Sequence, residues 1–177
     1  MSITSRRVLP LAAIVALVAL PATAHADDHG PVVRASGTLS DLQTATAGPF
    51  DGATASFQLV VSAQGSHGLL RVKGVDASAD GETFGAHLHS GPCVAGNGTA
   101  ALGHYNTDVL AGVTPTEISE DTEMWLDFTV DDRAATATAS VPFVPLPGAR
   151  SVVVHALATD HHTGLAGARL ACLPVVW

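Results

Sequence analysis

Residues 55–75, ASFQLVVSAQGSHGLLRVKGV, decide the fold class. Two runs rich in alternating apolar and β-branched residues, 55–63 and 69–75, are typical of strands. Between them, Gln64-Gly65-Ser66 has the residue types of a tight turn. The stretch therefore predicts a β-hairpin.

Similar runs recur along the chain, at 32–36, 84–89, 125–130, 135–141, 151–156 and 169–174. Turn residues such as Asp131-Asp132-Arg133 separate them, and no segment shows a sustained helical period. About eight short antiparallel strands at this spacing predict one all-β domain, a sandwich or a barrel. Two longer stretches, 90–124 and 157–168, are predicted to be loops, and long ordered loops commonly carry function.

The N-terminus has the parts of an export signal. Arg6-Arg7 precedes the apolar run 8–20, which is too short for a comfortable membrane span. Cleavage after Ala26 is favoured, and both the general and the twin-arginine export routes stay open. We therefore predict a signal peptide over 1–26 and one domain over 27–177. The product would be secreted or held in the cell envelope, with no membrane span after the signal is removed.

The charge of the chain excludes several partners. It has 8 Lys and Arg against 16 Asp and Glu. Loss of Arg6 and Arg7 with the signal leaves 6 basic residues against the same 16 acidic ones, a net charge near −10. Nucleic acids and anionic membrane surfaces attract proteins of the opposite charge, so we expect neither as a partner.

The chain contains two cysteines, Cys93 and Cys172. In an exported protein an even number of cysteines predicts a disulfide. This bond would close a loop of about eighty residues, which stabilises a fold by roughly 4 kcal/mol in the chain-entropy model.

Nine histidines are present, and two of them lie in Gly85-Ala86-His87-Leu88-His89. On a strand, residues two apart point to the same face, so His87 and His89 would lie side by side. Two imidazoles form half of a copper or zinc site. An isolated pair of this kind is more often exposed on a sheet surface.

Further residues follow this pair in a fixed order: Cys93, Gly103-His104-Tyr105-Asn106, Ser151-Val152-Val153-Val154-His155 and Ala166-Gly167-Ala168-Arg169-Leu170-Ala171-Cys172. With them, the chain from about residue 57 to 174 resembles the copper/zinc superoxide dismutase family. The resemblance implies a Greek-key β-sandwich that disproportionates superoxide to O2 and H2O2. It also implies a copper ion held by four histidines: His87, His89, His104 and His155.

The resemblance implies further roles. Arg169 matches the arginine that guides superoxide to the metal, and Cys93 and Cys172 match the family's disulfide. The histidine matched by His104 leaves copper and takes up a proton in the reduced state. We therefore predict that Arg169 and His104 are catalytic.

One departure from the family concerns zinc. The residue matched by His104 bridges copper and zinc in the family, and zinc takes further histidines and an aspartate from the loop that follows. Residues 105–123 contain no histidine here. We therefore predict a copper-only member without a structural zinc site. His161 and His162 lie in the second loop and are interpreted as exposed polar residues, while adventitious zinc binding there stays open.

Thr159 stands where the family has an aspartate that links a copper ligand to a zinc ligand. Asp108 and Asp160 are candidate acceptors for a ligand N–H, although the favoured interpretation is that both are surface acids.

Two alternative functions stay open beside the enzyme. One is a non-enzymatic protein that binds or buffers copper in the cell envelope, and it would not need Arg169. The other is a purely structural family member, which would be free to lose copper ligands. The oligomeric state is also left open.

Overall fold

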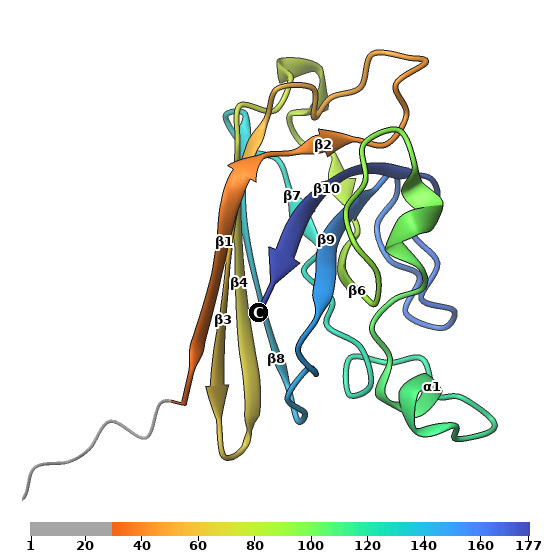
Figure 1. Ribbon diagram of the computed structural model, residues 1–177. Helices are drawn as coiled ribbons and strands as arrows, with labels where there is room; N and C mark the ends of the chain where they lie inside the picture. The colour runs from red at the N-terminus through yellow and green to blue at the C-terminus, as the bar shows by residue number, and fades with distance from the viewer. Residues whose placement is uncertain (1–29) are drawn as a thin grey trace, which may run out of the picture.

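The computed structural model describes residues 30–177 (Figure 1). The predicted signal peptide, 1–26, lies outside the described residues. Two four-stranded antiparallel sheets pack against each other, which confirms the predicted all-β sandwich. No helix in the described part of the chain is long and apolar enough to cross a membrane.

The first sheet has the order β1 (Val32–Thr38), β3 (Thr54–Ser62), β4 (Gly65–Lys73) and β8 (Ala134–Val141). The second sheet has the order β2 (Ser40–Asp41), β10 (Arg169–Val176), β9 (Ala149–His155) and β6 (Ala86–His89). A third sheet pairs β5 (Thr83–Phe84) with β7 (Phe128–Thr129). The short helical segments are η1 (Ala77–Ala79), η2 (Gly98–Ala101) and α1 (Thr107–Ala111).

The core lies between the two four-stranded sheets. The first sheet contributes alternate residues of its central strands, among them Phe57, Leu59 and Leu70, each at most 1% exposed. The second contributes Leu88 and Val154 in the same way. Burying a side chain of this size stabilises the fold by about 1.5–3 kcal/mol.

The hairpin predicted over 55–75 is confirmed, since β3 and β4 pair from Thr54–Lys73 to Ser62–Gly65. Its turn lies one residue earlier than predicted, because Gly65 already belongs to β4. Gly65 has a φ of 131°, and a Cβ atom there would collide with the carbonyl oxygen of Val141. A residue other than glycine does not fit this position.

Two predicted strands are wrong in extent. The run 125–130 forms a strand only at β7, and Trp125 makes an isolated bridge to His87. The run 84–89 is interrupted at Gly85, whose N–H donates to the carbonyl of Leu157 at 2.7 Å. The backbone of the second loop therefore replaces a neighbouring strand at this point.

Strand alternation places the predicted ligands outside the core. On β6, Leu88 points into the sandwich, so His87 and His89 face the opposite side of the sheet. On β9, Val154 is in the core and His155 faces outward. Segments 90–124 and 157–168 cover this side, so the histidines are buried although they lie outside the core.

The predicted disulfide between Cys93 and Cys172 is confirmed, with a Cα–Cα distance of 5.6 Å. Cys172 lies on β10, so the bond fastens the first loop to the second sheet. Ser151 Oγ also donates to the carbonyl of Gly91 at 2.9 Å. The loop that leads to His104 is therefore anchored at its start.

Candidate metal centre

The four histidines predicted as metal ligands lie together. His87 and His89 come from β6, His155 ends β9, and His104 is held beside β6 by an isolated bridge to His89. One ring nitrogen from each of the four lies within 4.8 Å of those of the others. All are buried except His104, which is half-buried.

The tautomers of His89 and His155 follow from their hydrogen bonds. His89 Nδ1 lies 3.2 Å from the carbonyl of Leu102, and His155 Nδ1 lies 3.3 Å from that of Gly167. A carbonyl only accepts, so both Nδ1 atoms carry the proton. Both Nε2 atoms then present lone pairs, and they lie 3.2 Å apart. Two hydrogen-bond acceptors at this distance repel each other unless a cation lies between them.

His87 is held from behind by Thr159 and Asp127. His87 Nε2–H donates to Thr159 Oγ1 at 2.7 Å, and this hydroxyl donates to Asp127 Oδ1 at 2.7 Å. The backbone N–H of Thr159 donates to the other oxygen of Asp127 at 2.8 Å. The Nδ1 atom of His87 is buried with no hydrogen-bond partner, so its lone pair is free for a ligand.

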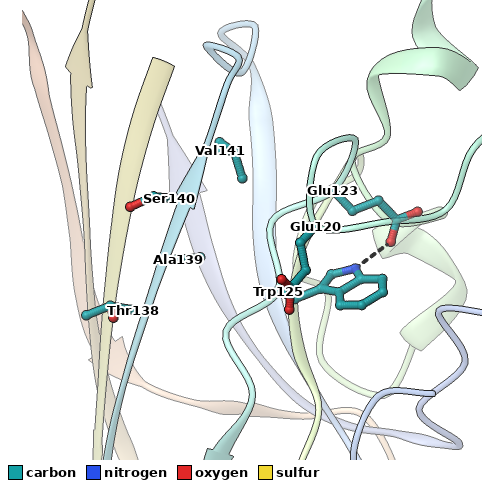
Figure 2. Close-up of a pocket in the computed structure, with 7 residues that line it drawn as sticks. All are labelled: Glu120, Glu123, Trp125, Thr138, Ala139, Ser140 and Val141. Atoms are coloured by element: carbon teal, nitrogen blue, oxygen red, sulfur yellow. Dashed lines mark hydrogen bonds between the residues drawn. The ribbon is translucent and has the colours of Figure 1, made fainter. Parts of the chain in front are cut away.

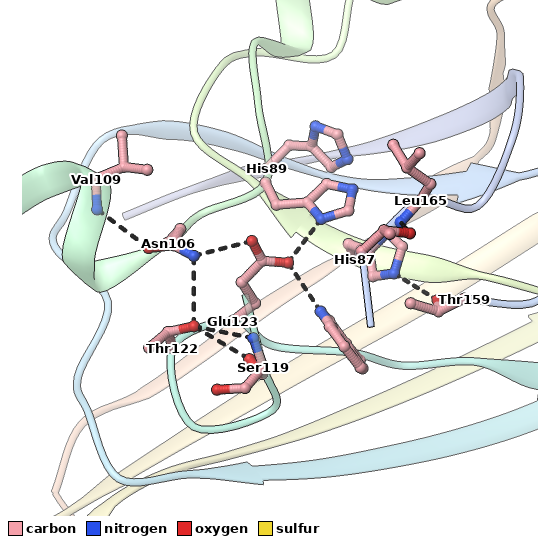
Figure 3. A network of polar contacts seen from close by, with 12 residues as sticks. His87, His89, Asn106, Val109, Ser119, Thr122, Glu123, Thr159 and Leu165 are labelled. Atoms are coloured by element: carbon pink, nitrogen blue, oxygen red, sulfur yellow. Dashed lines mark hydrogen bonds and ion pairs between the residues drawn. The ribbon is translucent and has the colours of Figure 1, made fainter. Parts of the chain in front are cut away.

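His104 is held by Glu123, which accepts three hydrogen bonds; Figure 3 shows the polar network around Glu123 and Asn106. His104 Nδ1–H and Trp125 Nε1–H donate to Oε2 at 2.7 and 2.8 Å. Asn106 Nδ2–H donates to Oε1 at 3.0 Å. Asn106 also caps α1 by accepting from the backbone N–H groups of residues 108 and 109. The carboxylate therefore leaves Nε2 as the free nitrogen of His104.

A cavity of about 150 Å³ lies between Glu123 and Trp125 on one side and β8 on the other (Figure 2). Trp125 Nε1 points to the Glu123 carboxylate across the near side of this cavity.

Burial keeps three of the cluster histidines, His87, His89 and His155, uncharged. Burial, followed by repulsion from the neighbouring histidines, lowers the pKa of His87 and of His89 far below the usual value. Burial lowers the pKa of His155 to about 4. At Glu123 burial alone would raise the pKa, but the hydrogen bonds from His104, Asn106 and Trp125 outweigh it and hold this pKa below the usual value. Neutral imidazole is the form that binds metals.

The residues present fit a metal ion. In each ring one nitrogen is occupied by a protein partner, and the other is left to the cluster: Nδ1 of His87 and Nε2 of His89, His104 and His155. Such orienting partners are characteristic of histidines that ligate metals.

Arg169 lies at the edge of the cluster, paired in register with His155. Its guanidinium donates to the carbonyls of Gly98 and Leu102, both at 2.5 Å. Leu102 has a φ of 58° and a ψ of −153°, a conformation that costs a non-glycine residue about 1–3 kcal/mol. The carbonyl of Leu102 in this conformation accepts hydrogen bonds from both Arg169 and His89. Within residues 30–177, no carboxylate pairs with Arg169.

Several other side chains behave as surface residues. Asp160 accepts from the backbone N–H groups of residues 162 and 163, and Asp108 accepts from that of residue 117. Neither contacts a cluster histidine, so their interpretation as surface acids is confirmed. His161 and His162 are exposed, and His161 lies 3.9 Å from Glu120.

Sequence reasoning missed Glu123 and Asp127 as partners of the cluster. Thr159 was interpreted only as the residue that replaces a linking aspartate of the family, whereas its hydroxyl connects His87 to Asp127. In the sequence, the role of Glu123 is indicated only by its position as an acidic residue at the end of a loop without histidine.

Compared with models of known protein families and with curated proteins, the sequence matches none.

Proposed function

We propose that the protein is an exported superoxide dismutase that uses a single copper ion bound by His87, His89, His104 and His155. The observation that carries the proposal is the convergence of four histidine side chains beside Arg169, which pairs with no carboxylate within residues 30–177. This combination provides a metal-binding centre and a local attraction for a small anion. The order of these residues in the chain resembles that of the dismutase family.

Copper is the metal that this donor set favours. Four imidazoles suit Cu(II) and tolerate Cu(I), and the site contains no thiolate or carboxylate among the facing atoms. Bound copper would supply a reversible one-electron change, which would let one superoxide be oxidised to O2 and a second superoxide, with two protons, be reduced to H2O2.

Arg169 would attract and orient the anionic substrate. The protein has a net charge near −10 after loss of the signal, so its overall field repels superoxide. A fixed cation next to the cluster reverses this field locally. The two carbonyls that hold the guanidinium keep it in place without neutralising it.

The Glu123 contact supports a centre with one metal. A histidine that bridges two metals needs both ring nitrogens, and Nδ1 of His104 is bonded to Glu123 instead. With the proton held at Nδ1, Nε2 is the atom of His104 that can either face a metal or accept a proton. The carboxylate thereby orients the ring, as a second metal would.

The disulfide supports an oxidising compartment, in agreement with the export signal proposed for 1–26. A protein in the cell envelope or outside the cell would meet superoxide there. The same histidines would also serve a copper buffer, but a buffer has no use for a cation held beside the cluster.

The dependence of superoxide decay on ionic strength tests the proposal. Copper-loaded protein should remove superoxide near the diffusion limit, about 10⁸–10⁹ M⁻¹s⁻¹. Arg169→Gln should lower the rate constant about tenfold and weaken its salt dependence. Arg133→Gln is the control, because Arg133 donates to the carbonyl of Val75 away from the cluster. An Arg169→Gln protein with unchanged rate and salt dependence would contradict the guiding role.

A further inference from the structure

The outer surface of the first sheet carries no acidic residue. Alternate residues on each strand point to solvent, and the register aligns Ser36, Ser56, Arg71 and Thr136 in one row across the sheet. Every second residue of β1, β3, β4 and β8 points to the same side as these four. None of these outward residues is Asp or Glu. We name these outward positions the basic face.

The basic face carries three cations, Arg34, Arg71 and Lys73. They are half of the six Lys and Arg residues that follow the proposed signal peptide. In the described part of the chain, none of the three has a carboxylate within ion-pair distance. The face is therefore positively charged, although the protein as a whole is strongly negative.

A shallow hollow lies at one end of the basic face. Its volume is about 440 Å³, and its lining includes Ser36, Ser56, Arg71 and Lys73. A guanidinium can bind a carboxylate or sulfate through two parallel hydrogen bonds. Serine and threonine hydroxyls, which occupy most of the other outward positions, can donate to and accept from sugar hydroxyls.

We propose that the basic face binds an anionic polysaccharide. A membrane surface would require exposed apolar side chains that insert between lipids. Of the large apolar residues at outward positions, Val60 and Leu69 are half-buried and Val32 is 36% exposed. A single-stranded nucleic acid would require aromatic rings for base stacking, and no Phe, Tyr or Trp occupies an outward position. Charge and hydroxyl groups without apolar anchors fit a charged, hydroxylated polymer.

The basic face and the histidine cluster lie on opposite sides of the sandwich. Figure 1 shows the two sheets as separate layers. The histidine cluster lies on the outer side of the second sheet, and the basic face is the outer side of the first. A polysaccharide on the basic face would therefore not cover the side of the molecule that holds the cluster. The proposal does not depend on the metal or on the proposed enzyme activity.

The test places acids opposite the cations. Thr54 pairs in register with Lys73, and Thr136 pairs with Arg71. All four are exposed, and opposite charges across paired strands are compatible with folding. The double variant Thr54→Asp/Thr136→Asp therefore lowers the charge of the face from +3 to +1 while the sheet is kept.

The control is Thr44→Asp/Thr116→Asp, which makes the same change in charge at exposed loop threonines. Binding would be measured at low ionic strength to heparin, to polygalacturonate and to neutral dextran.

We expect the parent and the control variant to bind heparin or polygalacturonate but not dextran. The Thr54→Asp/Thr136→Asp protein should lose at least about tenfold in affinity, and salt near 0.5 M should abolish binding by the parent. Circular dichroism would verify that each variant is folded.

Three results would overturn the proposal: no binding of either polyanion by the parent, an equal loss in both variants, or binding only to phosphatidylglycerol vesicles.

Discussion

The Nε2 atoms of His89 and His155 lie 3.2 Å apart, with the Nδ1 proton of each ring committed to a backbone carbonyl. In the metal-free protein two lone pairs face each other inside a buried cluster. Folding brings the two lone pairs together without a hydrogen-bond donor between them. This arrangement lowers the stability of the metal-free fold and leaves a site that a cation can fill. Four predictions follow from this arrangement and from the groups around it.

Copper should stabilise the folded protein through these histidines. A ligand that binds only the folded state at a free concentration 1,000 times its Kd adds about 4.1 kcal/mol. We expect His155→Ala to lose most of the rise in Tm caused by Cu(II). His67→Ala, at an exposed histidine of β4, should keep it. Calorimetry with and without a chelator measures both, and an equal rise in the two variants would show that copper binds elsewhere.

The metal-free protein should lose stability as the pH falls below about 6.5. His87, His89 and His155 have lowered pKa values in the folded state, mainly because of burial, so the unfolded chain binds more protons in this range. Each such histidine costs about 1.4 kcal/mol per pH unit until its folded-state pKa is reached, which is about 4 for His155.

Urea unfolding of the metal-free protein between pH 7.5 and 5 checks this slope. His155→Ala should flatten it by the contribution of one proton. A free energy of unfolding that stays constant or increases on acidification would be inconsistent with neutral, buried histidines.

Glu123→Gln should weaken the support of His104. An amide cannot accept from all three of His104, Asn106 and Trp125 in the same orientation, and a hydrogen bond to a charged group is worth about 1.5–3 kcal/mol. We expect a loss of that size in unfolding experiments and an altered Cu(II) paramagnetic resonance spectrum. Glu120→Gln, at an exposed acid of the same loop, should change both by little. Identical spectra in parent and Glu123→Gln protein would remove Glu123 from the centre.

Thr159→Val should disturb His87 while Thr159→Ser should not. Valine has nearly the shape of threonine but no hydroxyl, so His87 Nε2–H and Asp127 Oδ1 both lose a partner. A buried donor without a partner costs about 1–3 kcal/mol. We expect weaker copper binding and lower stability in the valine variant, with recovery in the serine variant. If serine and valine behave alike, the hydroxyl does not position His87.

The sequence was sufficient for features that depend on local pattern. The hairpin over 55–75 follows from alternation and a turn, and the shared face of His87 and His89 follows from their spacing on β6. The position of His155 at a strand end could be predicted for the same reason. These features repeat with the period of a strand, so few residues define them.

Contacts made by the long loops could not be predicted in the same way. Glu123 reaches His104 across 19 residues, and Asp127 reaches Thr159 across 32, with no periodicity to indicate either pair. The two-residue strands β2, β5 and β7 depend on tertiary pairing, because two residues carry no pattern. Gly85 ends a strand because the second loop, and not a strand, binds its backbone.

The most direct test of the central claim is superoxide decay catalysed by protein loaded with copper alone. We expect one copper per chain, a rate constant near the diffusion limit, no gain on adding zinc, and loss of activity in His155→Ala. One tightly bound copper per chain with slow superoxide decay would contradict the claim and would indicate a protein that stores or carries the metal.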